Sequence, residues 1–279
     1  MIAIVTDSTA YLTQREAQQM GVRLVPISYT VNSRSYNETY ADKNGNFERI
    51  IALSGGDCQV TTSQTTLPVF MATFEELIRK GYEVLCITLS SRLSGTYSNA
   101  SVAARNLGGE HIHILDSMLA AGGTYLLIQA AAEMIRQERS MGEIIDRLMK
   151  LRERIGIVFS VSDMGPLRRS GRLGIVRQSV GTVLNIRPIL KVYEGCVVSD
   201  GIARGRHDQM RQMIARVPQQ VERLIVHEIG GGTASQALQE RLRQQYPGVP
   251  VQRRSVGPVL GIHLGMDVIG IVWEQKDSL

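Results

Sequence analysis

Apolar and polar residues in the first half of the chain alternate between strand-like and helix-like spacing. Apolar runs at residues 2–6, 22–31, 84–89 and 111–115 are typical of buried strands. Apolar residues at helical spacing predict helices at 12–20, 47–53, 69–79 and 119–136, with another directly after Ser94, whereas residues 61–68 are predicted to form a polar turn. Repeated strand–helix units of this kind predict a largely parallel sheet covered by helices.

The second half has a different pattern, which predicts a second domain. A helix at 141–154 leads into a strand at 155–161, and two strands at 185–193 and 196–202 are joined by Glu194-Gly195, a good hairpin turn. Helices at 208–216 and 234–246, with strands at 221–229 and near Val251 and Val268, complete it. We therefore expect two α/β domains: residues 1–153 with a mainly parallel sheet, and residues 154–279 with a mixed sheet and helices.

Composition is that of an ordinary globular protein, with 43% hydrophobic and 20% charged residues. No apolar run approaches the ~20 residues that span a bilayer. The N-terminal segment resembles a first strand rather than a signal peptide, so we expect a cytoplasmic protein without an integral membrane segment. The three cysteines are odd in number and widely spaced, which favours neither a disulfide framework nor a zinc site, and we expect no metal and no cofactor.

The net charge of +5 raises the question of nucleic-acid binding. Most of the positive charge is arginine spread over helices beside Glu and Gln, which is usual for a solvated face. Aromatic residues are only 5%, and no basic stripe is interleaved with them. We expect no nucleic-acid partner.

Hydroxyl and acidic side chains gather where predicted strands end. Asp7-Ser8-Thr9, the run 90–96 and Asp116-Ser117 each follow a strand, and the carboxyl ends of parallel strands meet at one edge of a sheet. The run 90–96 has four hydroxyls and a glycine at the start of a helix, where backbone N–H groups and the helix dipole suit an anionic head group. Simple helix capping by Ser94 is the alternative interpretation.

Other motifs leave two alternative functions open. The turn 230–233 (GGGT) lacks the spacing and the lysine of a phosphate loop, but glycine turns of this kind keep a sugar- or nucleotide-phosphate binder open. No GxSxG elbow is present, although Ser94 with His263 leaves a serine-dependent acyl hydrolase or acyltransferase possible. His111 and His113 alternate on a strand face without a third ligand nearby in sequence, so a solvated face is favoured over a metal site.

Taken together and in order, the motifs resemble the DegV family of bacterial fatty-acid-binding proteins. The resemblance covers the whole chain, and its most specific part is the run 90–97 (SSRLSGTY). The other matching segments are Asp7-Ser8-Thr9, Thr62-Ser63-Gln64, Asp116-Ser117, Gly171-Arg172-Leu173, the run 185–190 (NIRPIL) and the run 257–263 (GPVLGIH). The chain departs from the family in the run 264–267 (LGMD), in Pro68 and in Ser170.

The resemblance implies a long-chain fatty acid buried in a tunnel between the two domains. It implies that Thr62 and Ser94 bind the carboxylate, that His263 lies close by, and that Ser63, Gly95 and Thr96 support the pocket. It also implies that the protein is not an enzyme but presents the fatty acid to a separate ATP-dependent fatty acid kinase of phospholipid metabolism, which forms the acyl phosphate.

A cluster of arginines offers a candidate surface for that partner. Arg168, Arg169, Arg172 and Arg177 lie within ten residues of one another, next to the proposed domain junction. A solvated turn is the alternative interpretation. We expect Arg169 and Arg172 to contact the kinase, because rim charges steer association.

Overall fold

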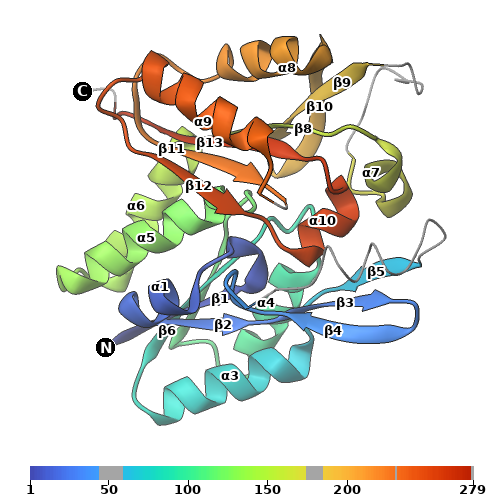
Figure 1. Cartoon of the computed structure of the whole chain (residues 1–279). Coiled ribbons are helices and arrows are strands. Elements are labelled where there is room, and N and C mark those ends of the chain that lie inside the picture. The colour runs from blue at the N-terminus through green and yellow to red at the C-terminus, as the bar shows by residue number, and fades with distance from the viewer. Residues whose placement is uncertain (44–58, 174–184, 230, 278–279) are drawn as a thin grey trace. The chain divides into compact units, whose positions relative to one another are not determined.

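The computed structural model describes residues 1–43, 59–173, 185–229 and 231–277. The predicted helix at 47–53, Cys58 and Arg177 lie outside these residues. The chain forms two compact units, one of Met1–Arg152 with Gly257–Val259, and one of Glu153–Val256 with Leu260–Leu279. Figure 1 labels most of the helices and strands of both units.

A parallel four-stranded sheet forms the centre of the first unit, as predicted. Its strands are β1 (Ile2–Asp7), β2 (Val22–Val25), β6 (Glu83–Thr88) and β7 (Ile112–Asp116), in the order β2-β1-β6-β7. Every neighbouring pair is parallel. The carboxyl ends of β1, β6 and β7 therefore share one edge, which is where the sequence places its hydroxyl-rich turns.

Helices cover both faces of this sheet. α3 (Leu67–Arg79) and α4 (Thr96–Asn106) bury Phe70, Phe74 and small residues such as Ala100 in one core cluster with the sheet. α5 (Gly122–Arg136) packs against β1 and β6. Within the described residues of this unit, the other helical elements are the 3-10 turn η1 (Ser8–Ala10), α1 (Gln14–Gln19) and α6 (Met141–Arg154).

Two sequence predictions in this unit are wrong. The run 22–31 is not one strand, because Pro26, which has no N–H to donate, separates β2 from β3 (Ile27–Val31). β3 joins β4 (Arg34–Glu38) and β5 (Val60–Ser63) in a second, antiparallel sheet of order β4-β3-β5. The polar turn predicted at 61–68 is thus a strand at its start.

The second unit is built on a mixed six-stranded sheet, also as predicted. Its strand order is β10-β9-β8-β13-β11-β12, with only β11 and β12 parallel. The strands are β8 (Ile155–Ser160), β9 (Ile186–Tyr193), β10 (Cys196–Arg204), β11 (Val221–Glu228), β12 (Val251–Ser255) and β13 (Ile269–Gln275). The β9–β10 hairpin turns at Glu194 and Gly195, both with positive φ, as a type I′ turn requires.

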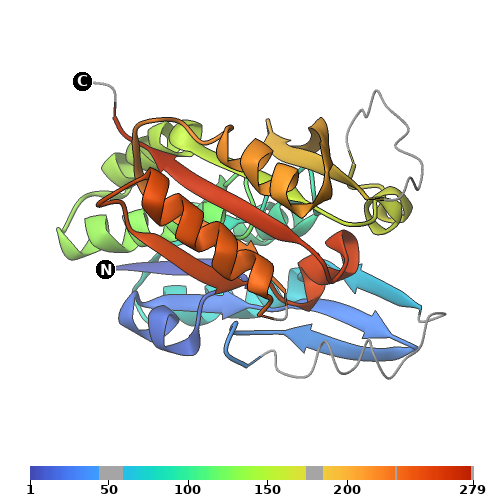
Figure 2. The same cartoon turned by 45° about the horizontal axis from the view of Figure 1, so that its top comes forward.

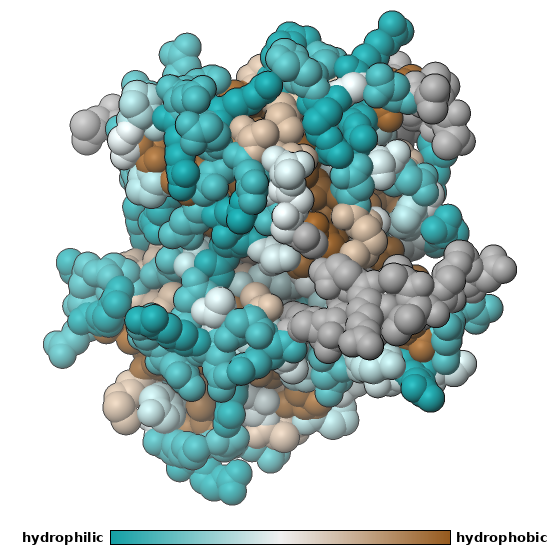
Figure 3. Space-filling model, in the orientation of Figure 1, coloured by the Kyte–Doolittle hydropathy of each residue, from teal (hydrophilic) through white to brown (hydrophobic). Residues whose placement is uncertain are grey.

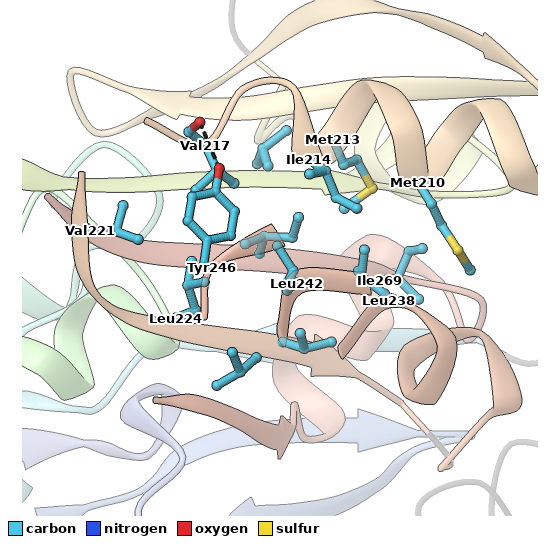
Figure 4. Packing of buried hydrophobic residues seen from close by; sticks show 14 of the residues in the cluster. Met210, Met213, Ile214, Val217, Val221, Leu224, Leu238, Leu242, Tyr246 and Ile269 are labelled. Atoms are coloured by element: carbon cyan, nitrogen blue, oxygen red, sulfur yellow. Dashed lines mark hydrogen bonds between the residues drawn. The ribbon is translucent and has the colours of Figure 1, made fainter. Parts of the chain in front are cut away.

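Two helices lie together on one face of this sheet. α8 (Gly205–Ile214) and α9 (Thr233–Gln245) run side by side over it in both cartoon views (Figure 1, Figure 2). Figure 4 shows their apolar side chains meeting those of the strands, and the Tyr246 hydroxyl donating to the Val217 carbonyl oxygen at 3.1 Å. The short helices α7 (Gly165–Ser170) and α10 (Pro258–Leu264) are absent from the sequence prediction.

The surface in view is mostly hydrophilic, with apolar residues in small patches (Figure 3). Among the described residues, the large apolar side chains that stand exposed are Met1, Met149, Tyr193, Ile202 and Met266. None of the described helices has the length and hydropathy to cross a membrane.

Candidate functional site

The carboxyl edge of the parallel sheet is held together by two aspartates. Asp7 Oδ2 accepts a hydrogen bond from the Leu89 N–H at 2.8 Å, which joins the end of β1 to the turn after β6. Asp116 Oδ1 accepts from the Ser91 N–H at 3.1 Å and joins the end of β7 to the same turn. Both carboxylates thus brace the turn that begins the run 90–96. Burial raises the pKa of Asp7 against the hydrogen bonds that it accepts.

Ser94 lies at the start of α4 and takes part in its local hydrogen bonding. The Thr96 N–H donates to Ser94 Oγ at 3.3 Å, and the two hydroxyls share a hydrogen bond at 2.9 Å. Ser94 is half-buried, whereas Thr96 is fully buried. Ser94 thus does serve the helix start. With Thr96 as donor in the shared bond, the Ser94 proton points to an acceptor outside the turn.

The segment after β5 packs directly on the start of α4. A Cβ placed on Gly95 would lie 2.1 Å from Gln64 Oε1, so the Gln64 side chain lies against the Gly95 backbone and would have to move to admit a larger residue. The Asn99 side chain also donates to the Thr65 carbonyl oxygen at 2.8 Å. These contacts bring together the two motifs that carry Thr62 and Ser94.

Thr62 and Ser63 point to opposite sides of the small antiparallel sheet. Thr62 is half-buried and pairs with Tyr29 on β3, whereas Ser63 is exposed and pairs with Ser28. Alternation along the strand gives the two hydroxyls different surroundings. Thr62 is the one of the pair that is partly shielded from water, which suits a ligand contact better than the exposed Ser63.

His263 belongs to the second unit, near the end of α10. Burial, with the positive charge of Arg172, lowers its pKa to about 4, so the imidazole is neutral at pH 7. The helix ends at Leu264 and is followed by Gly265, whose φ is +82° and whose N–H donates to the Gly261 carbonyl oxygen at 2.8 Å. A neutral imidazole retains one N–H donor.

The run that departs from the family pattern has a structural role here. Asp267 accepts hydrogen bonds from Arg187 Nη1 at 2.8 Å and from Arg206 Nη2 at 2.9 Å. These two ion pairs lower the pKa of Asp267 against the opposing effect of burial. The turn after α10 is therefore held by two arginines of the second unit.

The described arginines of the cluster, Arg168, Arg169 and Arg172, are exposed. Arg168 and Arg169 lie on α7, and Arg172 follows the turn at Gly171. The Arg172 guanidinium donates to the Ser170 carbonyl oxygen.

A buried carboxyl group lies beside the start of α9. Glu228, at the end of β11, is buried, and its carboxylate accepts a hydrogen bond from the Ser235 hydroxyl. Arg253 Nε lies 3.2 Å from the other oxygen of the same carboxylate. A phosphate at this helix start would meet that carboxylate. The arrangement disfavours the phosphate-binding alternative.

Further candidates do not coincide with the predicted residues. A cavity of about 530 Å³ lies on the second unit, and none of Thr62, Ser94 and His263 lines it. Its lining residues, from α8, α9 and Ala215, are His207, Arg211, Ile214, Ala215, Arg241, Gln244 and Gln245.

His113 pairs with Glu83 at 3.0 Å, and in the described ranges no three metal-binding side chains come together.

One residue with an unusual environment is not anticipated by the sequence. Glu38, at the end of β4, is fully buried, and its Oε1 accepts from the Ser8 hydroxyl at 2.9 Å. Its Oε2 accepts from the Val259 N–H at 2.8 Å, across 221 positions of sequence. Burial raises its pKa to about 8 against these bonds. A lone glutamate in a polar stretch carries no signal of such a role.

Comparison with known proteins identifies the family. Residues 1–276 match the family described as "Uncharacterised protein, DegV family". A DegV domain-containing protein of Halalkalibacterium halodurans is 32% identical over 281 residues, which cover 98% of this chain and 98% of that protein. The chain belongs to the DegV family. The resemblance drawn from the motifs is confirmed.

Solved structures of DegV proteins confirm the fold. A Thermotoga maritima structure, described as a DegV lipid-binding protein, has a TM-score of 0.89 and 25% identity, and covers 100% of this chain and 99% of its own. Bacillus subtilis DegV, described as a fatty-acid-binding protein, has a TM-score of 0.86 and 28% identity, with 99% of each chain covered. These DegV proteins are described as binding lipid or fatty acid.

Proposed function

We propose that this protein binds a long-chain fatty acid and presents its carboxylate to a separate ATP-dependent kinase, which forms the acyl phosphate. Membership of the DegV family, with relatives described as fatty-acid-binding, supports the ligand class. The observation that carries the site is the packing of Gln64 on Gly95, because it joins the segments of Thr62 and Ser94. The assignment of His263 and of the kinase rests on the family resemblance.

The proposed donors suit a carboxylate attached to an apolar chain. Burying ~16 carbons at ~0.8 kcal/mol per CH₂ contributes on the order of 10 kcal/mol before losses. The carboxylate that enters with the chain is costly to bury unless it is hydrogen-bonded. Thr62 and Ser94 supply hydroxyl donors, and the neutral His263 supplies an N–H. Neutral donors hold the carboxylate without a salt bridge, which leaves its oxygens reactive toward a phosphoryl donor.

The hydrolase alternative receives less support. A serine nucleophile needs a general base that takes its proton near neutral pH. The pKa of His263 is lowered to about 4 by burial, with a further contribution from Arg172, so this imidazole is a weak base. Ser94 Oγ is moreover engaged with the Thr96 N–H and hydroxyl. Both features fit a positioned hydrogen-bond donor better than a nucleophile.

The ligand and its carboxylate contacts can be tested together. Organic extracts of the purified protein should contain about one fatty acid per chain by mass spectrometry. Losing one donor to a charged acceptor costs about 1.5–3 kcal/mol, so Ser94→Ala and Thr62→Ala should each weaken stearate binding roughly tenfold or more. Thr61→Ala, on the exposed side of the same strand, is the matched control and should bind as the wild type does.

Two outcomes would contradict the proposal in different ways. A folded protein that contains no lipid and takes up no added stearate would refute fatty-acid binding itself. Unchanged affinity in both Ser94→Ala and Thr62→Ala would place the carboxylate elsewhere. A covalent adduct of the wild type with a fluorophosphonate probe, lost in Ser94→Ala, would instead establish the hydrolase alternative.

A further inference from the structure

Glu38 connects the end of β4 to the first turn of α10. Gly257–Val259 pack with the first unit, and the Val259 N–H is among the first backbone donors of the helix, which have no partner within it. Glu38 Oε2 accepts this N–H at 2.8 Å. A side chain from a distant strand thus supplies the cap that the sequence around Pro258 does not contain.

The carboxyl group of Glu38 is itself held firmly. Ser8 Oγ donates to Oε1 at 2.9 Å and accepts from the Ile27 N–H at 3.1 Å, so the bond lies within a chain of buried groups. Ser8 and Glu38 are fully buried, and Tyr11, which also hydrogen-bonds Glu38, is 1% exposed. Because these bonds hold the carboxyl group of Glu38 in place, its Oε2 can in turn hold the Val259 N–H in place.

We propose that Glu38 is a positioning residue for fatty-acid binding, which holds the first turn of the helix that carries His263. This inference rests on the proposed function, since it gives Glu38 its effect through His263. The turn after α10 is held by Arg187 and Arg206 on Asp267, so the segments before and after His263 are each held by a side chain from outside the helix. Without Glu38, the Val259 N–H in the first turn of α10 loses this acceptor.

A double-mutant cycle on stearate affinity tests the proposal. Glu38→Leu places an apolar side chain of similar size in the buried site and removes the acceptor of the Val259 N–H. We expect stearate binding to weaken about threefold to tenfold, the range for one hydrogen bond. The same substitution should add nothing in a His263→Ala background, yet keep its full effect in a Ser94→Ala background.

Two further variants separate positioning from general stability. Tyr246→Phe removes the buried hydrogen bond to the Val217 carbonyl oxygen in the core of the second unit, outside the Glu38 network, so it should lower the melting temperature while stearate affinity stays within twofold. Glu38→Gln retains an amide oxygen for the Val259 N–H and should restore wild-type affinity at pH 7. Should Glu38→Leu fail to fold, Glu38→Asp, whose carboxylate is one methylene shorter, takes its place in the cycle with the same expected loss.

Each result supports or overturns a distinct statement. Equal losses from Glu38→Leu with and without His263 would overturn the positioning role, while the single effects of Ser94→Ala and His263→Ala would still support the proposed function. An unchanged affinity in Glu38→Leu would also overturn it. Failure of the wild type to bind stearate would refute the proposed function instead.

Discussion

Replacing Glu38 by Gln should change how the stability of the protein depends on pH. In the folded protein, burial, opposed by hydrogen bonds from Val259, Ser8 and Tyr11 and reinforced by the charge of Asp7, raises the pKa of Glu38 from 4.5 to about 8. The unfolded chain ionises near 4.5, whereas the folded protein holds its proton until about pH 8. The contribution of protonated Glu38 to the free energy of unfolding is therefore complete below pH 4.5 and is lost as the pH rises to about 8.

The magnitude follows from proton linkage. Each unit of pKa difference corresponds to about 1.4 kcal/mol, and so does each pH unit inside the window. Glutamine has no proton to lose, so it does not share this decline. Between pH 5.5 and 7.5 the free energy of unfolding of Glu38→Gln should rise relative to that of the wild type by about 3 kcal/mol.

Urea unfolding followed by far-ultraviolet circular dichroism at several pH values measures this difference directly. Glu133→Gln is the matched control, because Glu133 is an exposed carboxyl on α5 whose pKa is lowered by Gln137 and Arg136. The ionisation of Glu133 changes the free energy of unfolding only below the ordinary pKa of glutamate, outside the range of pH 5.5 to 7.5. Wild-type and Glu38→Gln curves that run parallel from pH 5.5 to 7.5 would refute the reasoning, and so would a Glu38 carboxyl that titrates near 4.5 in ¹³C NMR.

Three further outcomes are expected. Gly95→Ala should weaken stearate binding because its methyl group would displace the Gln64 side chain that joins the segments of Thr62 and Ser94. Gly142→Ala, with open space on α6, should raise stability by about 0.5–1 kcal/mol in urea unfolding. The exchange of Arg169 and Arg172 for Glu should leave stearate binding intact but slow acyl-phosphate formation by the cognate kinase, most at low salt. Wild-type rates of this double variant at low salt would show that the kinase docks on another face of the protein. His227, whose pKa burial lowers to about 4, should titrate below pH 5 in NMR, and stability should fall as the pH drops from 6.5 toward 4; a midpoint near 6.5 would contradict its burial.

Regular periodicity accounts for what the sequence predicted well. The buried parallel strands β1, β6 and β7 are short apolar runs followed by helices, and the helix Met141–Arg154 has the predicted bounds. In such segments burial and local propensity favour the same structure. The hairpin at Glu194-Gly195 likewise combines turn chemistry with flanking strands.

The wrong predictions fall in segments where burial, periodicity and local propensity are weak or conflict with one another. β5 is a strand of exposed and half-buried hydroxyl residues, and its polar composition resembles a turn because only pairing with β3 holds it extended. α1 begins at Gln14 rather than at residue 12 because the Thr13–Glu16 capping box fixes its start. α10 is too short for a periodic pattern, and its cap comes from Glu38.

The candidate site was only partly accessible to sequence reasoning. Hydroxyls at strand ends indicated the edge of the sheet, and parallel pairing brings those ends together. The packing of Gln64 on Gly95 depends on two segments about thirty residues apart, so it leaves no mark in either alone. The network around Glu38 is less visible still, because Glu38 and its partners come from three separate stretches of chain.

The inclusion of Gly257–Val259 in the first unit bears on how the protein is made in the cell. A ribosome that has released residues 1–152 has not yet supplied the Val259 N–H that Glu38 accepts. Until the last part of the chain emerges, a buried carboxyl group lacks one of its donors, and the N-terminal half cannot reach its final structure during synthesis. Completion of the first unit must therefore wait until Val259 has been synthesised.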